Sequence, residues 1–502
     1  MHSLINLKSK NTIYIFALMI ITTVLLFFVT TTSPIRDINY LNYDSTIFYI
    51  IGRGIKYGYV PYLDLTDHKG IYIFLINYLA ALISESNHLG LFIVHLLITY
   101  FTIIVVYKIS DFVTKNPIIN FFTTLTIVIL YNNYFFSHGA VKCETFLMPF
   151  LYLSLYLFLK NDWGKKWFSK NMFIIGICAG VILFTKANSV LCLLPIVIYL
   201  VIISIMDKRY IDIIRLFISG MMGVIVGILP GLIYCIANNC LEEMIKYSYL
   251  YNITYSNYLF YVYKSYFDAI QRIFLYFMGW ILLSIISIVA FYKLTNDKKL
   301  LIFYIPFVIF NNIASFMALR PFSYHANPLL LNVLFLIVFV YLVFEKKVME
   351  KRKHLKFLYG LVISLLFIYS YILTWKYSEL QNIRYKDFAK EVHQYFDEEN
   401  VYIEQNKKSP VLVVGITLNI YNEFNVFPGL KNFCIPNMSN KDENEIYDEF
   451  INSLNSGSNE YVILSNNAIM IKDGFLEEVR SIMDRDYKLV LEYLGGELYK
   501  RK

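Results

Sequence analysis

Long apolar segments separated by short charged loops fill the first three quarters of the chain. Segments of roughly 20 apolar residues are long enough to cross a hydrocarbon core about 30 Å thick. The pattern predicts a polytopic α-helical membrane protein with about 11 transmembrane helices. We expect these helices, with boundaries accurate to a few residues, near 13–31, 89–107, 118–135, 146–159, 172–184, 190–206, 213–236, 273–292, 300–318, 328–344 and 357–371.

One further apolar run, Gly70–Ile83, has only 14 residues. Because this is shorter than the roughly 17 residues that a spanning helix needs, we interpret it as a juxtamembrane helix that lies flat on the outer surface. The remaining spans then place the Lys/Arg-rich segment Glu345–Lys356 and the other strongly basic loops inside, as the positive-inside rule requires. The N-terminus is therefore expected to be cytoplasmic, and a long Tyr-rich loop, Ala237–Gln271, is expected outside.

The pattern changes after residue 375. Short β-branched runs at 410–414, 461–464 and 488–493 predict strands, and the segments 378–396 and 444–454 have helical periodicity. This part has 15 Lys+Arg against 21 Asp+Glu, whereas the whole chain has a formal net charge of +8. We expect two domains, a transmembrane domain at 1–375 and a small extracytoplasmic α/β domain at 376–502.

Composition agrees with a multi-pass protein of the plasma membrane. Charged residues make up 16% of the chain, against roughly 25% in soluble domains. The basic residues follow the membrane loops and form no patch on a soluble domain, so a nucleic-acid partner is not expected. The six Cys have no spacing that indicates a metal site or a disulfide framework, and we interpret them as small apolar side chains.

Charged residues that could carry chemistry gather at the predicted outer ends of the spans. A transporter would more often hold such residues near the middle of the membrane. Lys and Arg can bind the phosphate of a lipid-linked substrate, and a carboxylate can take a proton from an attacking hydroxyl. Outer loops also contain charges simply because they are wet, so the grouping, and no single residue, carries the hypothesis. The group comprises Asp44, Asp64, Asp67, His68, Lys69, Lys142, Glu144, Lys186, Arg320 and His325.

Four motifs in this group resemble those of the GT-C glycosyltransferases, with the protein O-mannosyltransferase and lipid A aminoarabinose transferase branches as the nearest kin. The first outer loop contributes Asp44–Tyr49 and Gly58–Gly70, and the second contributes Lys142–Pro149. Thr185–Asn188 resembles the Lys-containing end of the fifth span, and Arg320–His325 resembles an Arg/His motif of bacterial members. The resemblance covers most of the membrane part and, loosely, the C-terminal domain.

The resemblance implies a GT-C-like fold and inverting transfer of a sugar from a polyprenyl-phosphate donor to a cell-envelope acceptor at the outer face. By position, Asp44 would be the general base with Asp67 as its rival, and Glu144 would orient the acceptor or bind a metal. Cations would hold the donor phosphate, and further polar residues would bind substrate. The phosphate-binding residues are Lys69, Lys186 and Arg320, the substrate-binding ones are His68, Tyr324 and His325, and a divalent ion could use Asp67, His68 or Glu144.

Two features keep alternatives open. The mannosyltransferase loop begins with Asp-Glu, whereas this chain has Asp44-Ser45, so a mannosyl donor is not implied. The alternative function is a transporter or flippase of a lipid-linked saccharide, which would need inner-side cationic contacts and alternating access and would move its substrate without consuming the donor. Asp64 is interpreted as a turn residue after Pro61.

Overall fold

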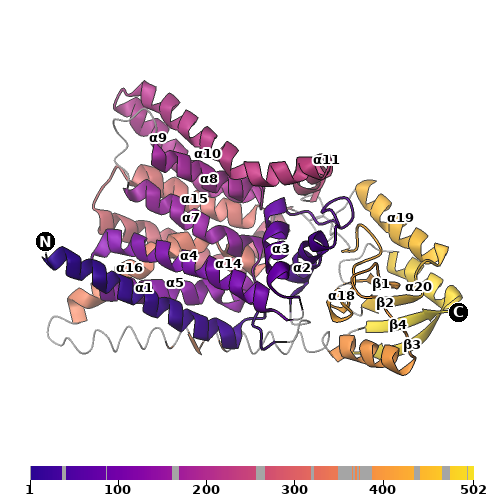
Figure 1. Ribbon diagram of the computed structural model, residues 1–502. Helices are drawn as coiled ribbons and strands as arrows, with labels where there is room; N and C mark the ends of the chain where they lie inside the picture. Colours follow the sequence, from indigo (N-terminus) through magenta and orange to yellow (C-terminus); the bar gives the residue numbers. More distant parts are fainter. Residues whose placement is uncertain are drawn as a thin grey trace. The chain divides into compact units, whose positions relative to one another are not determined.

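The computed structural model describes residues 2–36, 41–85, 87–160, 169–255, 266–317, 322–348, 365, 368–369, 372, 387–415, 417–434, 441–465, 475–494 and 496–502. The chain divides into two compact units (Figure 1). The helical unit comprises Met1–Thr30, His95–Ile233 and Ser265–Trp375, and the mixed unit comprises Thr31–Val94, Tyr234–Lys264 and Lys376–Lys502. Because each unit joins segments far apart in the sequence, the division at residues 375/376 stays a prediction.

Long apolar helices make up the helical unit, in the order that the hydrophobic pattern predicted. The first residues of α4, up to Val94, and the last residues of α10, from Tyr234, are assigned to the mixed unit. The elements are α1 (His2–Val29), α4 (Leu89–Thr114), α5 (Pro117–Asn132), α6 (Tyr134–Ser137), α7 (Cys143–Lys160), α8 (Lys170–Leu183), η2 (Ala187–Leu193), α9 (Leu194–Met206), α10 (Tyr210–Ala237), α14 (Tyr266–Thr295), α15 (Leu301–Phe316), η5 (Ser323–Ala326) and α16 (Leu329–Val348).

Six helices in the described part of the chain are long and apolar enough to cross a membrane. Shorter apolar helices occupy other predicted spans, among them α5, α8, α15 and α16. The prediction of a multispan helical fold is confirmed. The number of eleven spans stays a prediction, since the eleventh, near 357–371, falls mostly outside the described residues.

Local signals in the sequence fix where several helices begin. Asn116 caps α5, because its side-chain oxygen accepts the N–H groups of Ile118 and Ile119, and Pro117 occupies the first helical turn. Ser169 caps α8 in the same way through the N–H of Met172 at 3.3 Å. These caps satisfy N–H groups that a helix end would otherwise leave without partners.

Glycines allow α8 and α10 to approach closely. A Cβ on Gly176 would lie 2.1 Å from the carbonyl oxygen of Gly220, and one on Gly180 would lie 2.6 Å from that of Val224. From the other side, a Cβ on Gly223 would lie 2.0 Å from the Phe173 oxygen. No larger side chain fits at these points, which is the small-residue packing expected of helices in a membrane.

The mixed unit contains short helices and one small sheet. Its elements in the first half of the chain are α2 (Tyr43–Lys56), α3 (Ile71–Ile83), α11 (Leu241–Ile245), the π-helical turn η3 (Lys246–Leu250) and α12 (Tyr251–Tyr255). The last three lie within the predicted long loop Ala237–Gln271, and α14 begins at Tyr266, a few residues before the predicted end of that loop. Glu242 and Glu243 lie in the first turn of α11, where acidic side chains favour a helix start.

The C-terminal part of the mixed unit forms a four-stranded sheet in the order β1-β2-β4-β3. Strands β1 and β2 run parallel and are fully buried, while β4 pairs antiparallel with both β2 and β3. The predicted α/β domain is confirmed. Its elements are a helix at 387–398, β1 (Val411–Val414), α18 (Ile420–Glu423), α19 (Lys441–Ser456), β2 (Tyr461–Ser465), α20 (Phe475–Asp486), β3 (Tyr487–Tyr493) and β4 (Gly496–Arg501).

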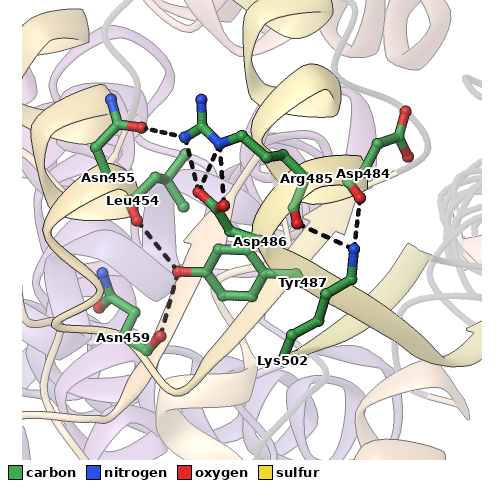
Figure 2. Close-up of polar contacts among 8 residues, drawn as sticks. All are labelled: Leu454, Asn455, Asn459, Asp484, Arg485, Asp486, Tyr487 and Lys502. Carbon is green, nitrogen blue, oxygen red and sulfur yellow. Dashed lines mark hydrogen bonds and ion pairs between the residues drawn. The ribbon is translucent and has the colours of Figure 1, made fainter.

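Polar contacts hold the ends of β3 and β4 to the neighbouring helices (Figure 2). Arg485 donates to Asp486 and to Asn455. The Tyr487 hydroxyl, at the start of β3, lies 3.4 Å from the Leu454 carbonyl oxygen. The Lys502 ammonium donates to the carbonyl oxygens of Asp484, at 2.7 Å, and Arg485. The junction between α20 and β3 is therefore fixed by both side chains and backbone.

Candidate functional site

The first outer-loop motif begins in the first turn of α2. Asn42 caps this helix by accepting the N–H of Ser45 at 3.2 Å, and Asp44 follows in the turn, half-buried. A carboxylate at a helix N-terminus is favourable because the helix dipole is positive there. This accounts for an acid at position 44 whether or not it takes part in chemistry.

A tight loop follows α2 and leads to the second part of the motif. Asp64 accepts the N–H of Val60 at 2.7 Å and closes the turn around Pro61, which confirms its interpretation as a turn residue. Tyr62 is fully buried, and its hydroxyl donates to the Lys69 carbonyl oxygen at 2.8 Å. These bonds fix the backbone on both sides of Asp67 and His68.

Asp67, His68 and Lys69 form one contiguous ionic group. Asp67 is 7% exposed, and its Oδ1 lies 3.1 Å from Nδ1 of His68, whose Nε2 contacts the Lys69 ammonium. The other oxygen of Asp67 has no hydrogen-bond partner among the described residues. Burial would raise the pKa of Asp67, but the neighbouring His68 ring and Lys69 ammonium outweigh it and hold that pKa below its ordinary value.

Cys434 lies beside this ionic group, although the sequence indicated only a small apolar side chain. Its thiol donates to the Thr66 carbonyl oxygen at 3.2 Å. Burial raises the pKa of this thiol well above its ordinary value, and the charges of Asp67, Lys69 and Asp44 also act on it. No signal near a single Cys in a mainly acidic domain could have predicted this position.

A second cluster lies in the helical unit, around Glu144 in the first turn of α7. Glu144 is buried and forms an ion pair with Lys186, which immediately precedes η2. Nε2 of His325, on η5, lies 3.6 Å from the same Glu144 oxygen. The second, fifth-span and Arg/His motifs are therefore brought together, as three separate segments meet at one carboxylate.

Aromatic rings surround the cations of this second cluster. The Lys142 ammonium lies 3.5 Å from the centre of the Tyr324 ring, a cation–π contact, and Lys142 itself is almost fully buried. His138 packs edge-on against Tyr324 and lies 3.2 Å from the Ser323 hydroxyl. Asn327 completes the loop by donating to a backbone oxygen of Phe136 at 2.6 Å. His138 and Asn327 were not among the predicted site residues.

The predicted site residues thus fall into one group in each unit. Asp44, Asp67, His68 and Lys69 belong to the mixed unit, whereas Glu144, Lys186, Tyr324 and His325 belong to the helical unit. Arg320 lies outside the described residues, and its phosphate-binding role stays a prediction.

The residues suggested for a divalent ion do not form a donor set in the described ranges. No three His, Cys, Asp or Glu side chains of the described chain gather in a group that could hold a metal ion. Asp67 and His68 supply two donors, and the oxygen of Glu144 already faces the Lys186 ammonium. A cation in that position competes with a metal, so we derive no step through one.

Part of the chain matches a known protein family. The sequence profile of a family described as "Dolichyl-phosphate-mannose-protein mannosyltransferase" matches residues 68–234. No curated protein matches the sequence significantly.

Several solved structures share the fold. ArnT from Cupriavidus metallidurans, in its crystal structure bound to undecaprenyl phosphate, has a TM-score of 0.56 at 10% identity, with 97% of each chain covered. ArnT from the same organism in the apo state gives 0.53 at 10% identity, again over 97% of each chain. The archaeal oligosaccharyltransferase AglB from Archaeoglobus fulgidus gives 0.48 at 12% identity, over 90% of this chain and 69% of that chain.

Proposed function

We propose that this chain, which has the fold of the GT-C superfamily of membrane glycosyltransferases, transfers a sugar from a polyprenyl-phosphate donor to a cell-envelope acceptor. The transfer would take place at the outer face of the plasma membrane. Undecaprenyl phosphate is the ligand named for the ArnT structure of the same fold. It suggests a donor whose phosphate is anionic and whose lipid tail lies in the bilayer.

The observation that carries the proposal is the cluster at Glu144. Three segments far apart in the chain place Lys186 and His325 against one buried carboxylate, and Lys142 lies next to it on the Tyr324 ring. Burying an ionic group costs free energy unless its charges are paired. Lysine side chains gathered at one buried site suit the anionic phosphate of a donor.

In the proposed reaction, Asp44 takes the proton of an acceptor hydroxyl. The hydroxyl oxygen attacks the anomeric carbon as the bond from that carbon to the phosphate oxygen breaks, which inverts the configuration. The departing polyprenyl phosphate keeps the electron pair, and Lys69 with Lys186 or Arg320 stabilises its charge. Glu144 orients the acceptor or holds Lys186, and His68, Tyr324 and His325 bind the substrates.

Between the two candidate bases, the environment favours Asp44. Asp67 is almost fully buried and already paired with His68, and its lowered pKa makes it a weak base. Asp44 is half-buried in the first turn of α2, so an acceptor hydroxyl can approach it more easily than it can approach Asp67. We assign Asp67 the task of holding His68 and Lys69 in place.

The test is the Asp44→Asn variant in purified protein, with Asp64→Asn as the matched control. Loss of a general base lowers turnover by about 10²–10⁴-fold, whereas Asp64→Asn keeps the oxygen that closes the turn and should remain active. Turnover of Asp44→Asn at the wild-type rate would refute the role of Asp44. Vesicles that move a lipid-linked saccharide across the bilayer without cleaving it would instead support the flippase.

A further inference from the structure

Residues 417–434 of the C-terminal part contact the first outer-loop motif at three separate points, all within the mixed unit. We propose that this bracing segment is a positioning element of the active site, which sets the places of Asp44 and of Asp67–Lys69. The proposal rests on the proposed function, because it assigns those residues a common reaction. On this proposal the C-terminal part influences the reaction rate by positioning catalytic residues, without contacting substrate itself.

The first contact is at Asn419, which bridges the two sides of Asp44. Its side-chain oxygen lies 2.5 Å from the Thr46 hydroxyl, and its side-chain nitrogen donates to the Leu41 carbonyl oxygen at 3.3 Å. Thr46 and Leu41 stand two residues after and three residues before Asp44. One side chain of the outer domain therefore holds the chain on both sides of the proposed base.

The second contact is Arg53, in the middle of α2 and 1% exposed. Its guanidinium donates to the side-chain oxygen of Asn425 at 2.6 Å and to the carbonyl oxygens of Tyr421 and Val426. Its central carbon lies 4.6 Å from the centre of the Phe427 ring. All of these partners belong to the bracing segment.

A buried arginine is a costly way to pack two elements together. Burial lowers the pKa of Arg53, yet a guanidinium stays protonated in proteins, so the charge must be satisfied by hydrogen bonds. An apolar side chain could fill the same volume without this cost. What the arginine adds is direction, because its planar fork fits these acceptors in only one arrangement of α2 against the bracing segment.

The third contact is at Thr66, directly before Asp67. The Thr66 N–H donates to the Lys431 carbonyl oxygen at 3.0 Å, and the Thr66 carbonyl oxygen accepts the Cys434 thiol at 3.2 Å. The backbone N–H and the backbone carbonyl oxygen of Thr66 are therefore both hydrogen-bonded to the bracing segment. With Asn419, this contact fixes the two ends of the motif that carry the proposed base and the donor-binding lysine.

Packing alone would predict a different outcome from positioning. If these contacts only attach the outer domain, their loss should lower thermal stability and leave the turnover of folded protein unchanged. If they position Asp44, a small displacement should lower kcat, since a 1 Å error in a reacting group can cost about 100-fold in rate. The Michaelis constant for donor should stay almost constant, because the donor-binding cations are untouched.

The experiment compares Asn419→Ala and Thr46→Val with Lys407→Ala. Lys407 lies in the same part of the chain, with its side chain 65% exposed and facing Glu404, so its loss should change nothing. We expect kcat to fall about 10-fold or more in each of the first two variants, with the donor Michaelis constant within about twofold of wild type. The double variant should have about the same kcat as Asn419→Ala alone, because that single variant already removes the bond to Thr46 as well as the bond to Leu41.

Wild-type kcat in folded Asn419→Ala and Thr46→Val would overturn the proposal. If one variant fails to fold, the other carries the test, because Val replaces Thr46 without a change of shape. Hydrogen exchange of the peptides covering 41–49 and 64–70 gives a readout that needs no activity. If hydrogen exchange in these peptides is faster in Asn419→Ala but the wild-type protein transfers no sugar, the proposed function is refuted while the structural role of the bracing contact is supported.

Discussion

Replacing Lys186 with Met tests whether the Glu144 cluster is a buried ionic site. The variant keeps the length and most of the volume of the side chain but removes the ammonium that faces Glu144, whose carboxylate is 5% exposed. Removing one partner of a buried ion pair costs about 3–5 kcal/mol, because the other charge stays buried without compensation. The Lys186 side chain is 15% exposed, so we expect the lower end of this range. Thermal or denaturant unfolding in detergent measures the change.

The matched control is Lys115→Met, which removes a second lysine from a carboxylate pair. Lys115 lies 3.6 Å from Asp111 with its side chain 70% exposed, and such surface pairs contribute about 0–1 kcal/mol. The double variant Lys186→Met with Glu144→Gln should recover most of the lost stability, because the Glu144 charge that Lys186 compensates is removed as well. Equal unfolding midpoints for Lys186→Met and Lys115→Met would refute a buried pair at Glu144.

Three further predictions follow from other parts of the structure. Ionised Asp67, whose pKa is held low despite burial, stabilises the fold above its unfolded-state pKa of about 3.9; the deficit of Asp67→Asn in unfolding midpoint should disappear as pH falls through the lower folded-state value. Gly180→Leu should separate α8 from α10 and lower the yield of folded protein, measured by size-exclusion chromatography, because its side chain would meet a carbonyl oxygen. If Asn87 and Tyr402 are both extracytoplasmic, an impermeant maleimide should label Asn87→Cys and Tyr402→Cys equally in whole cells, because both positions are exposed. The six native Cys are buried and should give little background. Labelling of only one of the two variants would place these positions on opposite sides of the membrane.

Elements that depend on local periodicity could be predicted from the sequence. The strands at 410–414, 461–464 and 488–493 and the helix at Gly70–Ile83 are all present, because alternation and apolar spacing act within a few residues. The predicted span at 190–206 corresponds to the apolar helix Ala187–Met206, whose first part is the 3-10 helix η2, and Pro195 lies in the first turn of its α-helical part, α9. In these cases the information lies within the segment itself.

Contacts between distant segments could not be predicted in this way. Arg53 looks like one charge in an apolar helix, and its partners Asn425 and Val426 stand more than 370 residues later. Cys434 likewise meets Thr66 across 368 residues. A pattern of hydrophobic and polar positions indicates which residues are buried but not which of them contact one another. The contacts of the bracing segment could therefore be identified only from the structure.

The arrangement of α2 and α3 bears on how the first outer loop meets the membrane. The two helices run side by side in the same direction. The rings of Phe48 and Phe74 are 6.2 Å apart, and further along a Cβ on Gly52 would lie 2.5 Å from the Cβ of Asn77. Beyond both helix ends, Tyr57 donates to a Glu85 oxygen at 3.0 Å.

This parallel pairing argues that α3 does not cross the bilayer. If it did, α2 would have to cross beside it in the same sense, and the connection 57–70 would return through the hydrocarbon as irregular chain, which is not found exposed to lipid. The 13 residues of α3 span only about 20 Å, short of the roughly 30 Å required. Helix α2 would also carry Asp44, Arg53 and Lys56 into lipid. The structure therefore agrees with a juxtamembrane position for α3, with Lys69 just before its first turn, and the assignment of this pair to the outer surface stays a prediction.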